Sequence, residues 1–160
     1  MILLTSAREP MSPRIEIRPA EPRDDARCRA IHGAATMSSY GSIYRWLERI
    51  VCDPDTPLET CEWMLVAELE GRLAGYVAVS ENHIENLYVD PEAQSAGVGA
   101  RLLEAVEDRL SGSITLRCLV VNERARRFYE RHGFVAAHQE RIDYHGRPLE
   151  AWFMIKRRPA

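Results

Sequence analysis

The sequence lacks the signals of several protein classes. Its four cysteines show no C-x-x-C spacing and no metal-type pairing, so we expect buried thiols in a reducing cytoplasm and no metal site. The apolar run Ile2-Leu3-Leu4 is too short for a signal peptide or a membrane span. A net charge of −3 gives no concentrated basic face for nucleic acid. These absences predict a cytoplasmic protein with neither a membrane nor a nucleic-acid partner.

The composition indicates one globular domain. The chain has 160 residues, of which 46% are hydrophobic and 28% charged, enough for a single core. No internal repeat or low-complexity linker divides it. We expect residues 1–13 to form a flexible extension, in which Met11 is an alternative start, and residues 14–158 to form the domain.

Hydrophobic periodicity places the elements. Strands are expected at residues 15–17, 63–70, 72–80, 83–89, 113–121, 134–142 and 149–156. Helices are expected near 24–34, at 43–51 with Ser42 as the cap, at about 99–110, and at 123–132 with Asn122 as the cap. Residues 36–42 are expected to be a polar loop, and His83 and Glu85 to share the strand face of Leu87 and Val89. Periodicity alone gives only an α/β or α+β class.

The stretch His83 to Leu110 organises the chain. A strand stops at Asp90-Pro91, and a turn with Gly97 and Gly99 leads into a helix. A glycine turn before a helix N-terminus presents free backbone N–H groups to phosphate. The third glycine of the dinucleotide fingerprint is replaced by Leu102, and no Walker Lys-Ser/Thr follows. Taken alone, the turn favours an ordinary strand–helix connection over a phosphate site.

Two motifs resemble those of the GCN5-related N-acetyltransferase (GNAT) superfamily. Gln94, Gly97 and Gly99 fill the Q/R-x-x-G-x-G/A pattern of its motif A. The stretch from Asn122 to Phe134 resembles its motif B, N-x-x-A-x-x-F-Y-x-x-x-G-F. The resemblance covers most of the chain from about Ile15 and is weakest between Ala35 and Glu62. It implies the GNAT fold: a mixed, mostly antiparallel sheet of six to seven strands, flanked by four helices and splayed where acetyl-CoA binds.

The resemblance also implies how acetyl-CoA, the co-substrate, is held. The loop of residues 94–100 would bind the pyrophosphate, and the strand at Leu87 would pair with the pantetheine, its N–H polarising the thioester carbonyl. Asn122 would contact the pantetheine, and it is also a helix cap from its position alone. The implied cofactor-binding residues are Leu87, Tyr88, Val89, Gln94, Ser95, Ala96, Gly97, Val98, Gly99, Ala100, Asn122 and Phe128.

Three residues are the catalytic candidates. In the family, a tyrosine at the position of Tyr129 protonates the departing thiolate, and a phenol near pKa ~10 is suited to that step. From the helix pattern alone, Tyr129 would be a core aromatic residue. His83 aligns with a base position of the family and titrates near neutrality. Glu85, two residues on, is the second candidate base; both are also consistent with solvated strand residues.

The resemblance implies that the acceptor is a primary amine, of a small molecule or of a peptide or protein N-terminus, which attacks the thioester directly in a ternary complex. The expected acceptor walls are Met37, Ser38, Ser39, Tyr40 and Tyr44 on one side and Asp143, Tyr144 and His145 opposite. No sequence feature selects among amines. Two alternatives remain at this stage: an acyl-CoA-binding sensor without catalysis, and a non-catalytic interaction domain. Homodimerisation is left open.

Overall fold

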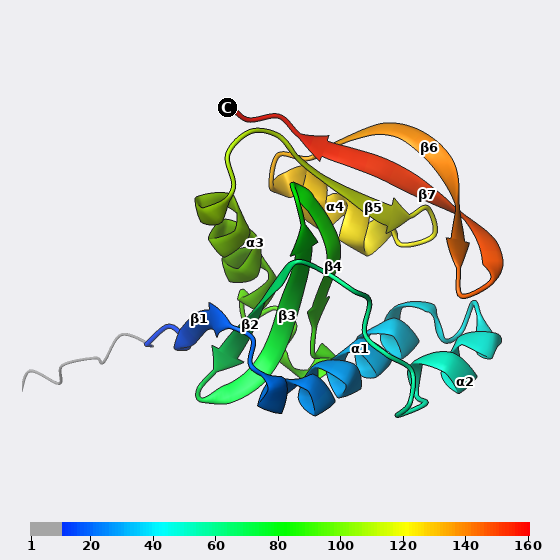
Figure 1. Cartoon of the computed structure of the whole chain (residues 1–160), viewed down its shortest axis with the longest axis horizontal. Helices are drawn as coiled ribbons and strands as arrows, with labels where there is room; N and C mark the ends of the chain where they lie inside the picture. Colours follow the sequence, from blue (N-terminus) through cyan, green and yellow to red (C-terminus); the bar gives the residue numbers. More distant parts are fainter. Residues whose placement is uncertain (1–10) are drawn as a thin grey trace, which may run out of the picture.

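A computed structural model describes residues 11–160 of the chain. Residues 1–10 of the expected extension therefore lie outside the described part, and residues 11–14 have no regular secondary structure. Seven strands and four α-helices follow (Figure 1). The strands are β1 (Ile15–Pro19), β2 (Trp63–Leu69), β3 (Arg72–Ser80), β4 (His83–Val89), β5 (Ile114–Leu119), β6 (Val135–Tyr144) and β7 (Arg147–Lys156). The helices are α1 (Asp25–Tyr40), α2 (Glu48–Val51), α3 (Val98–Arg109) and α4 (Glu123–Arg131), with 3-10 turns η1 (Pro22–Asp24), η2 (Arg45–Leu47) and η3 (Pro91–Ala93).

The strands form one sheet in the order β1-β2-β3-β4-β5-β7-β6. Only the β4–β5 pair is parallel; the other five neighbouring pairs are antiparallel. The expected mixed, mostly antiparallel sheet flanked by four helices is confirmed. Figure 1 shows β6 and β7 leaning away from the β2–β4 half of the sheet.

Helices cover both faces of the sheet because its central strands are apolar on both sides. In β3, Val77 and Val79 belong to the core beneath α3, whereas Tyr76, which directly precedes Val77, belongs to the core beneath α1. The α3 stripe predicted from periodicity, Leu102, Leu103 and Val106, is fully buried in the first of these cores, as is Val98. The remaining buried face lies where α2 meets the ends of β5 and β7.

Two hairpins end in two-residue turns with left-handed backbone. Glu70 and Gly71 have φ of 50° and 79° between β2 and β3, and His145 and Gly146 have φ of 51° and 79° between β6 and β7. Two successive positive φ values fit the right-handed twist of the flanking strands. Both turns were expected from sequence, although β6 and β7 each run two residues further toward their turn.

The region between α1 and α2 differs from the prediction. Residues 36–40 were expected in a loop, but α1 continues through them to Tyr40. Thr36 and Tyr40 are buried, so burial against the sheet outweighs the weak helix propensity of Thr and Ser. The expected helix 43–51 is instead η2 followed by one turn of α2, and Ser42 does not cap it: the N-cap of η2 is Tyr44, without a side-chain hydrogen bond.

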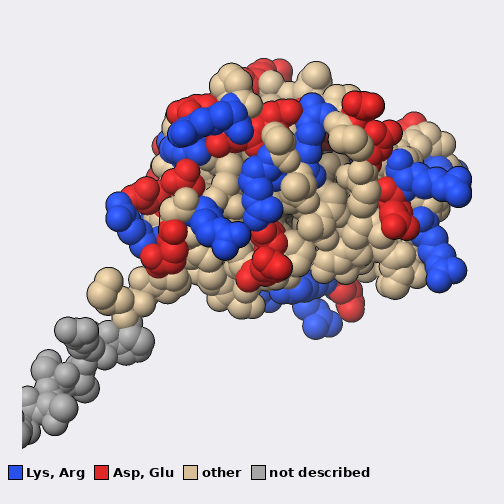
Figure 2. Space-filling view, turned by 90° about the horizontal axis from the view of Figure 1, so that it is seen from below, with Lys and Arg blue, Asp and Glu red and all other residues tan. Residues whose placement is uncertain are grey.

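The described residues contain no helix that is both long and apolar enough to cross a bilayer. Residues 11–160 also contain no cluster of three His, Cys, Asp or Glu side chains arranged for a metal ion. On the face shown in Figure 2, basic and acidic side chains alternate over short distances.

Candidate active site

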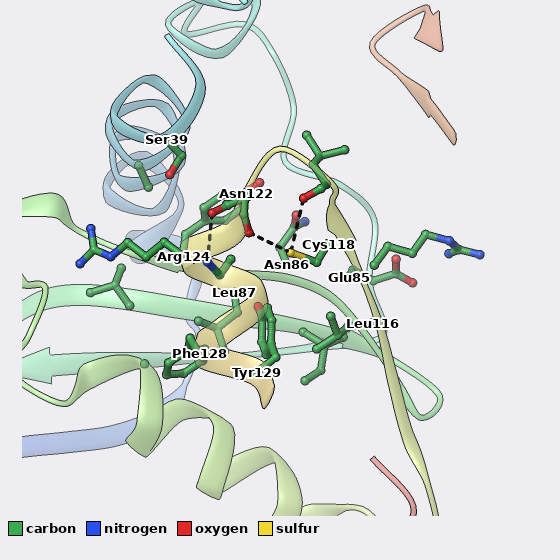
Figure 3. Close-up of a pocket in the computed structure, with 18 of the residues that line it drawn as sticks. Ser39, Glu85, Asn86, Leu87, Leu116, Cys118, Asn122, Arg124, Phe128 and Tyr129 are labelled. Atoms are coloured by element: carbon green, nitrogen blue, oxygen red, sulfur yellow. Dashed lines mark hydrogen bonds between the residues drawn. The ribbon is translucent and has the colours of Figure 1, made fainter. Parts of the chain in front are cut away.

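The site begins where β4 and β5 part. The two parallel strands pair at only two positions, His83 with Thr115 and Ile84 with Leu116, at their N-terminal ends. Both strands continue beyond these pairs without a shared ladder, so their facing edges diverge. The divergence opens a cavity of about 770 Å³ lined by both strands, α3, α4 and the end of α1 (Figure 3).

A β-bulge in β4 sets the orientation of its backbone at this opening. Val79 of β3 pairs with Ile84, but the preceding Ala78 pairs with Asn86, so Glu85 is the extra residue. Backbone N–H and C=O groups alternate between the two edges of a strand, and an extra residue reverses that alternation. The N–H and C=O groups of even-numbered residues of β4 therefore point to one edge of the strand before Glu85 and to the other edge after it.

Two hydrogen bonds show which edge these backbone groups face on either side of the bulge. Before the bulge, the Asn82 carbonyl accepts from the Thr115 N–H at 2.9 Å, so the N–H and C=O groups of even-numbered residues face β5. After the bulge, the Asp90 N–H donates to the Ala74 carbonyl of β3 at 2.8 Å, so the same groups of even-numbered residues face β3. The N–H and C=O groups of Leu87 and Val89 consequently face the side from which β5 has diverged. They are available to a ligand with amide groups.

The same bulge overturns one prediction about side chains. Ile84 and Leu87, an odd number of residues apart, pack in the same core. His83 instead bonds through Nδ1 to Thr115 Oγ1 at 2.8 Å, and Thr115 lies between the core residues Ile114 and Leu116. His83 is therefore on the opposite face of the sheet from Leu87, and the expectation that the two share a face was wrong. No sequence signal, such as a glycine, marks the bulge.

The loop after β4 ends in a left-handed residue at the start of α3. Gly97 is the N-cap, with φ of 88°, and Ser95 also has positive φ, 73°. The Arg101 N–H donates to the Gly97 carbonyl at 3.1 Å, which leaves the N–H groups of Val98, Gly99 and Ala100 without helical acceptors. A Cβ on Gly99 would stand 3.4 Å from the Phe128 ring, so this glycine lets α3 approach α4 closely.

Helix α4 contributes Asn122 and Tyr129 to the opposite wall (Figure 3). The Asn122 Oδ1 accepts from the Ala125 N–H at 3.0 Å, which confirms the expected N-cap. Its Nδ2 donates to the Tyr40 hydroxyl, at the end of α1, at 2.7 Å. Tyr129 is 9% exposed, and burial raises the pKa of its phenol above the ordinary value, so the hydroxyl is protonated at neutral pH.

The expected site residues converge on this one cavity. Fourteen of the fifteen line it: Tyr129, His83, Glu85, Leu87, Tyr88, Val89, Gln94, Ser95, Gly97, Val98, Gly99, Ala100, Asn122 and Phe128. Ala96 does not; it packs against the core instead. Of the expected acceptor walls, Ser39, Tyr40, Asp143 and Tyr144 line the cavity, whereas Met37 and Tyr44 pack into the core beside α2. Ser38 and His145 are not among the lining residues.

Several residues that line the cavity were not among the site residues predicted from the sequence. Arg117, Cys118, Glu140 and Glu59 all border the cavity, and none belongs to either motif. Arg117 contacts His83 Nε2 through NH1 at 3.4 Å and pairs with Glu140 of β6. Arg117 and Glu140 can pair because β5, β7 and β6 are neighbours in the sheet, and a local sequence pattern does not reveal which strands are neighbours. Glu59 lies in the loop before β2 and accepts from Asn86 Nδ2 at 3.1 Å.

Burial favours the neutral forms of the imidazole, the thiol and the phenols that line the cavity. Burial, with a smaller effect of Arg117, lowers the pKa of His83 below its ordinary value, while Glu85 opposes this shift. Burial raises the pKa of the Cys118 thiol to about 11. Cys118 is therefore a poor nucleophile at neutral pH, because the thiolate is the attacking form. An acyl group passing through this cavity has no activated thiol to receive it.

Comparison with known proteins gives consistent matches. An acetyltransferase (GNAT) domain model matches residues 53–147. The peptidyl-lysine N-acetyltransferase YjaB of Escherichia coli strain K12 is 30% identical over 124 residues, 76% of this chain and 79% of the relative. The solution structure of apo-form YjaB from Escherichia coli aligns with a TM-score of 0.72 at 23% identity, covering 89% of this chain and 97% of that one. The structure of yncA, a putative acetyltransferase from Salmonella typhimurium with its cofactor acetyl-CoA, aligns with a TM-score of 0.65 at 20% identity, covering 90% and 94%.

Proposed function

The chain belongs to the GNAT acetyltransferase family and is an acetyl-CoA-dependent N-acetyltransferase, and we propose that the amine it acetylates is the ε-amine of a peptide lysine. Relatives from Escherichia coli and Salmonella typhimurium carry the name peptidyl-lysine N-acetyltransferase. The observation that carries the proposal is the chemistry of the acceptor end of the cavity, described below.

The residues present fit coenzyme A. The free N–H groups of Val98, Gly99 and Ala100, together with the dipole of α3, form a site for the pyrophosphate. The left-handed Gly97 has no Cβ, and nothing but Ile15 Cδ1, at 3.9 Å, would be met by one. The outward N–H and C=O groups of Leu87 and Val89 suit the amides of the pantetheine arm. Acetyl-CoA supplies an activated acyl group and a thiol leaving group.

Two groups of the chain would stabilise the charge that develops during transfer. The Leu87 N–H faces the opening, where it can polarise the thioester carbonyl. The Tyr129 hydroxyl, kept protonated by burial, can give its proton to the departing sulfur. The high pKa of Cys118 supports direct attack by the amine over a covalent acyl-enzyme.

The acceptor ammonium must lose a proton before it attacks, and His83 is our candidate base. An arginine only donates hydrogen bonds, so its contact with Nε2 indicates that the lone pair is on Nε2 and the proton on Nδ1, toward Thr115. The lowered pKa keeps the ring neutral at neutral pH, so Nε2 can accept a proton once the acceptor amine displaces the Arg117 guanidinium from it. Glu85 borders the same cavity and would hold the ammonium or relay its proton through water.

The acceptor end combines carboxylates with aromatic rings. Glu59, Glu85 and Asp143 line the cavity with the rings of Tyr88 and Tyr144, as do Glu140 and Arg117, which pair with each other. Carboxylates attract an ammonium group, and aromatic faces suit both the cation and the apolar stem of a lysine side chain. A neutral or anionic amine would gain nothing from the three carboxylates.

The test is a competition between two peptides of the same length. One carries a single internal lysine and a blocked N-terminus; the other carries a free N-terminus and arginine in place of lysine. Both are incubated with acetyl-CoA and purified protein, and tandem mass spectrometry locates the acetyl group. We expect acetylation on lysine Nε. Acetylation confined to the free N-terminus would overturn the lysine proposal while leaving the acetyltransferase activity intact.

A further inference from the structure

A tyrosine outside both sequence motifs lines the same cavity. Tyr40, the last residue of α1, lines the cavity and is 8% exposed. Its hydroxyl accepts the Nδ2 hydrogen bond of Asn122 at 2.7 Å, which joins the end of α1 to the start of α4. Asn122 is itself fixed by its cap bond to the Ala125 N–H, so the Tyr40 hydroxyl is held on a rigid partner.

The direction of this hydrogen bond leaves the phenolic proton free. Asn122 donates through Nδ2, because its Oδ1 is already the acceptor of the cap bond. Tyr40 is therefore the acceptor, and its own O–H must point elsewhere. Within residues 11–160, the bond from Asn122 is the only hydrogen bond recorded for this hydroxyl. A buried donor without a protein acceptor is costly, unless a ligand in the cavity accepts it.

Tyr40 and the expected acid, Tyr129, line the same cavity. The hydrogen bond to Tyr40 comes from Asn122, the N-cap of the helix that carries Tyr129. Burial raises the pKa of Tyr40 itself, so its proton is present at neutral pH. The bond from Asn122 acts in the opposite direction and favours the phenolate, which makes the hydroxyl a better donor than an isolated buried phenol.

We propose that Tyr40 is a second phenolic donor of the acyl-transfer site, held by Asn122 and aimed at the negative charge that develops on the thioester oxygen or on the departing sulfur. Tyr129 gives the proton, and Tyr40 stabilises the charge by a hydrogen bond without losing its own proton. The proposal rests on the acetyltransferase activity but not on the identity of the amine. It also assigns Asn122 a role beyond the helix cap, since its amide orients the Tyr40 hydroxyl.

The first test is Tyr40→Phe, which keeps the ring and removes the donor. We expect kcat to fall on the order of 10²-fold, the effect of losing one donor to a developing anion, while the acetyl-CoA Kd from calorimetry changes by less than about threefold. Tyr44→Phe is the matched control, because Tyr44 stacks near Tyr40 with ring centroids 6.4 Å apart but does not line the cavity. The control should retain its kcat.

A second variant tests the same point through Asn122. Asn122→Asp keeps an oxygen to cap α4 but replaces the Nδ2 donor with an acceptor, so the Tyr40 O–H would turn toward it. We expect a kcat loss close to that of Tyr40→Phe and little further loss in the double variant, because both changes remove one interaction. The melting temperature of each variant confirms folding.

If the wild type is active, any of three results would overturn the proposal. The first is a kcat of Tyr40→Phe within twofold of wild type, and the second is a loss of kcat in Tyr40→Phe no larger than that in Tyr44→Phe. The third is a double variant in which the kcat losses of Tyr40→Phe and Asn122→Asp are fully additive. If Tyr40→Phe does not fold, the kcat of Asn122→Asp decides alone. Absence of turnover by the wild type would instead contradict the proposed function.

Discussion

At the scale of single residues, Tyr129 is the group on which the chemistry most depends. Tyr129→Phe preserves ring volume, so packing against Phe128 and Phe134, with ring centroids 5.2 and 5.7 Å away, should survive. We expect kcat to fall on the order of 10²-fold with unchanged coenzyme A affinity, as for removal of one positioned acid. Steady-state kinetics on the purified variant checks this. A kcat within about twofold of wild type would show that proton donation by Tyr129 does not limit the rate.

The pH profile tests His83 as the base. His83 acts only when neutral, and its pKa lies below 6.5, so kcat/KM should fall with decreasing pH on a limb centred below 6.5. Arg117 lowers this pKa and Glu85 raises it. Arg117→Met should therefore move the limb to higher pH and Glu85→Gln to lower pH, measured at saturating acetyl-CoA. A limb that persists at the same pH in His83→Gln would exclude His83.

Most of the residues that line the cavity on the α3 and α4 side could be predicted, because they belong to two short motifs. Gly97, Asn122 and Tyr129 come from these two stretches. The facing of His83 could not, since it depends on a bulge at Glu85 that carries no glycine or proline. Tyr40 was expected only as a wall of the acceptor side, because its bond to Asn122 joins residues 82 positions apart.

At the scale of elements, the loop entering α3 is the proposed site for the phosphate groups. Gly97→Val should weaken coenzyme A binding at least tenfold, because a β-branched residue resists φ of 88° and would turn N–H groups away from the ligand. Gly71→Val is the control: Gly71 has φ of 79° and no atom within 4 Å of a new Cβ, but is not among the residues that line the cavity. Calorimetry should show a normal Kd for the control. An unchanged Kd in Gly97→Val would contradict the phosphate site.

Helix α1 carries a buried histidine that makes stability depend on pH. His32 packs against Tyr88 with ring centroids 4.8 Å apart, and burial lowers its pKa from 6.5 to about 4. Between these pH values the unfolded imidazole binds a proton that the folded one excludes, so the free energy of unfolding falls as pH decreases from about 6.5 to about 4. The lowered pKa of His83 adds to this in the same direction.

His32→Gln isolates that contribution. The variant should lose less stability than wild type between pH 7 and pH 4.5, as followed by urea denaturation at each pH. Parallel losses in the two proteins would show that His32 titrates normally.

The end of α1 shows what could not be predicted from sequence: helix propensity placed residues 36–40 in a loop, and the burial of Thr36 and Tyr40 against distant strands keeps them helical. Helix α3 was predictable because its apolar stripe is local.

At the scale of the whole molecule, the function depends on a gap in the sheet. Strands β4 and β5 pair at two positions and then diverge, while antiparallel neighbours hold each of them along its other edge. The open edge of β4 and the N-terminus of α3 then supply backbone groups, and α1, α4 and the β6–β7 hairpin supply side chains. The mixed, mostly antiparallel sheet was predictable only through the family resemblance, since hydrophobic periodicity does not encode which strands are neighbours.

The most direct measurement counts products of one reaction. Purified protein is incubated with acetyl-CoA and a lysine peptide with a blocked N-terminus, and free thiol and acetyl-lysine are quantified in the same time course. Transfer in this cavity predicts one thiol released for each acetyl-lysine formed, both dependent on peptide and protein. Thiol release without acetyl-lysine, or coenzyme A binding with neither product for any amine, would contradict the account.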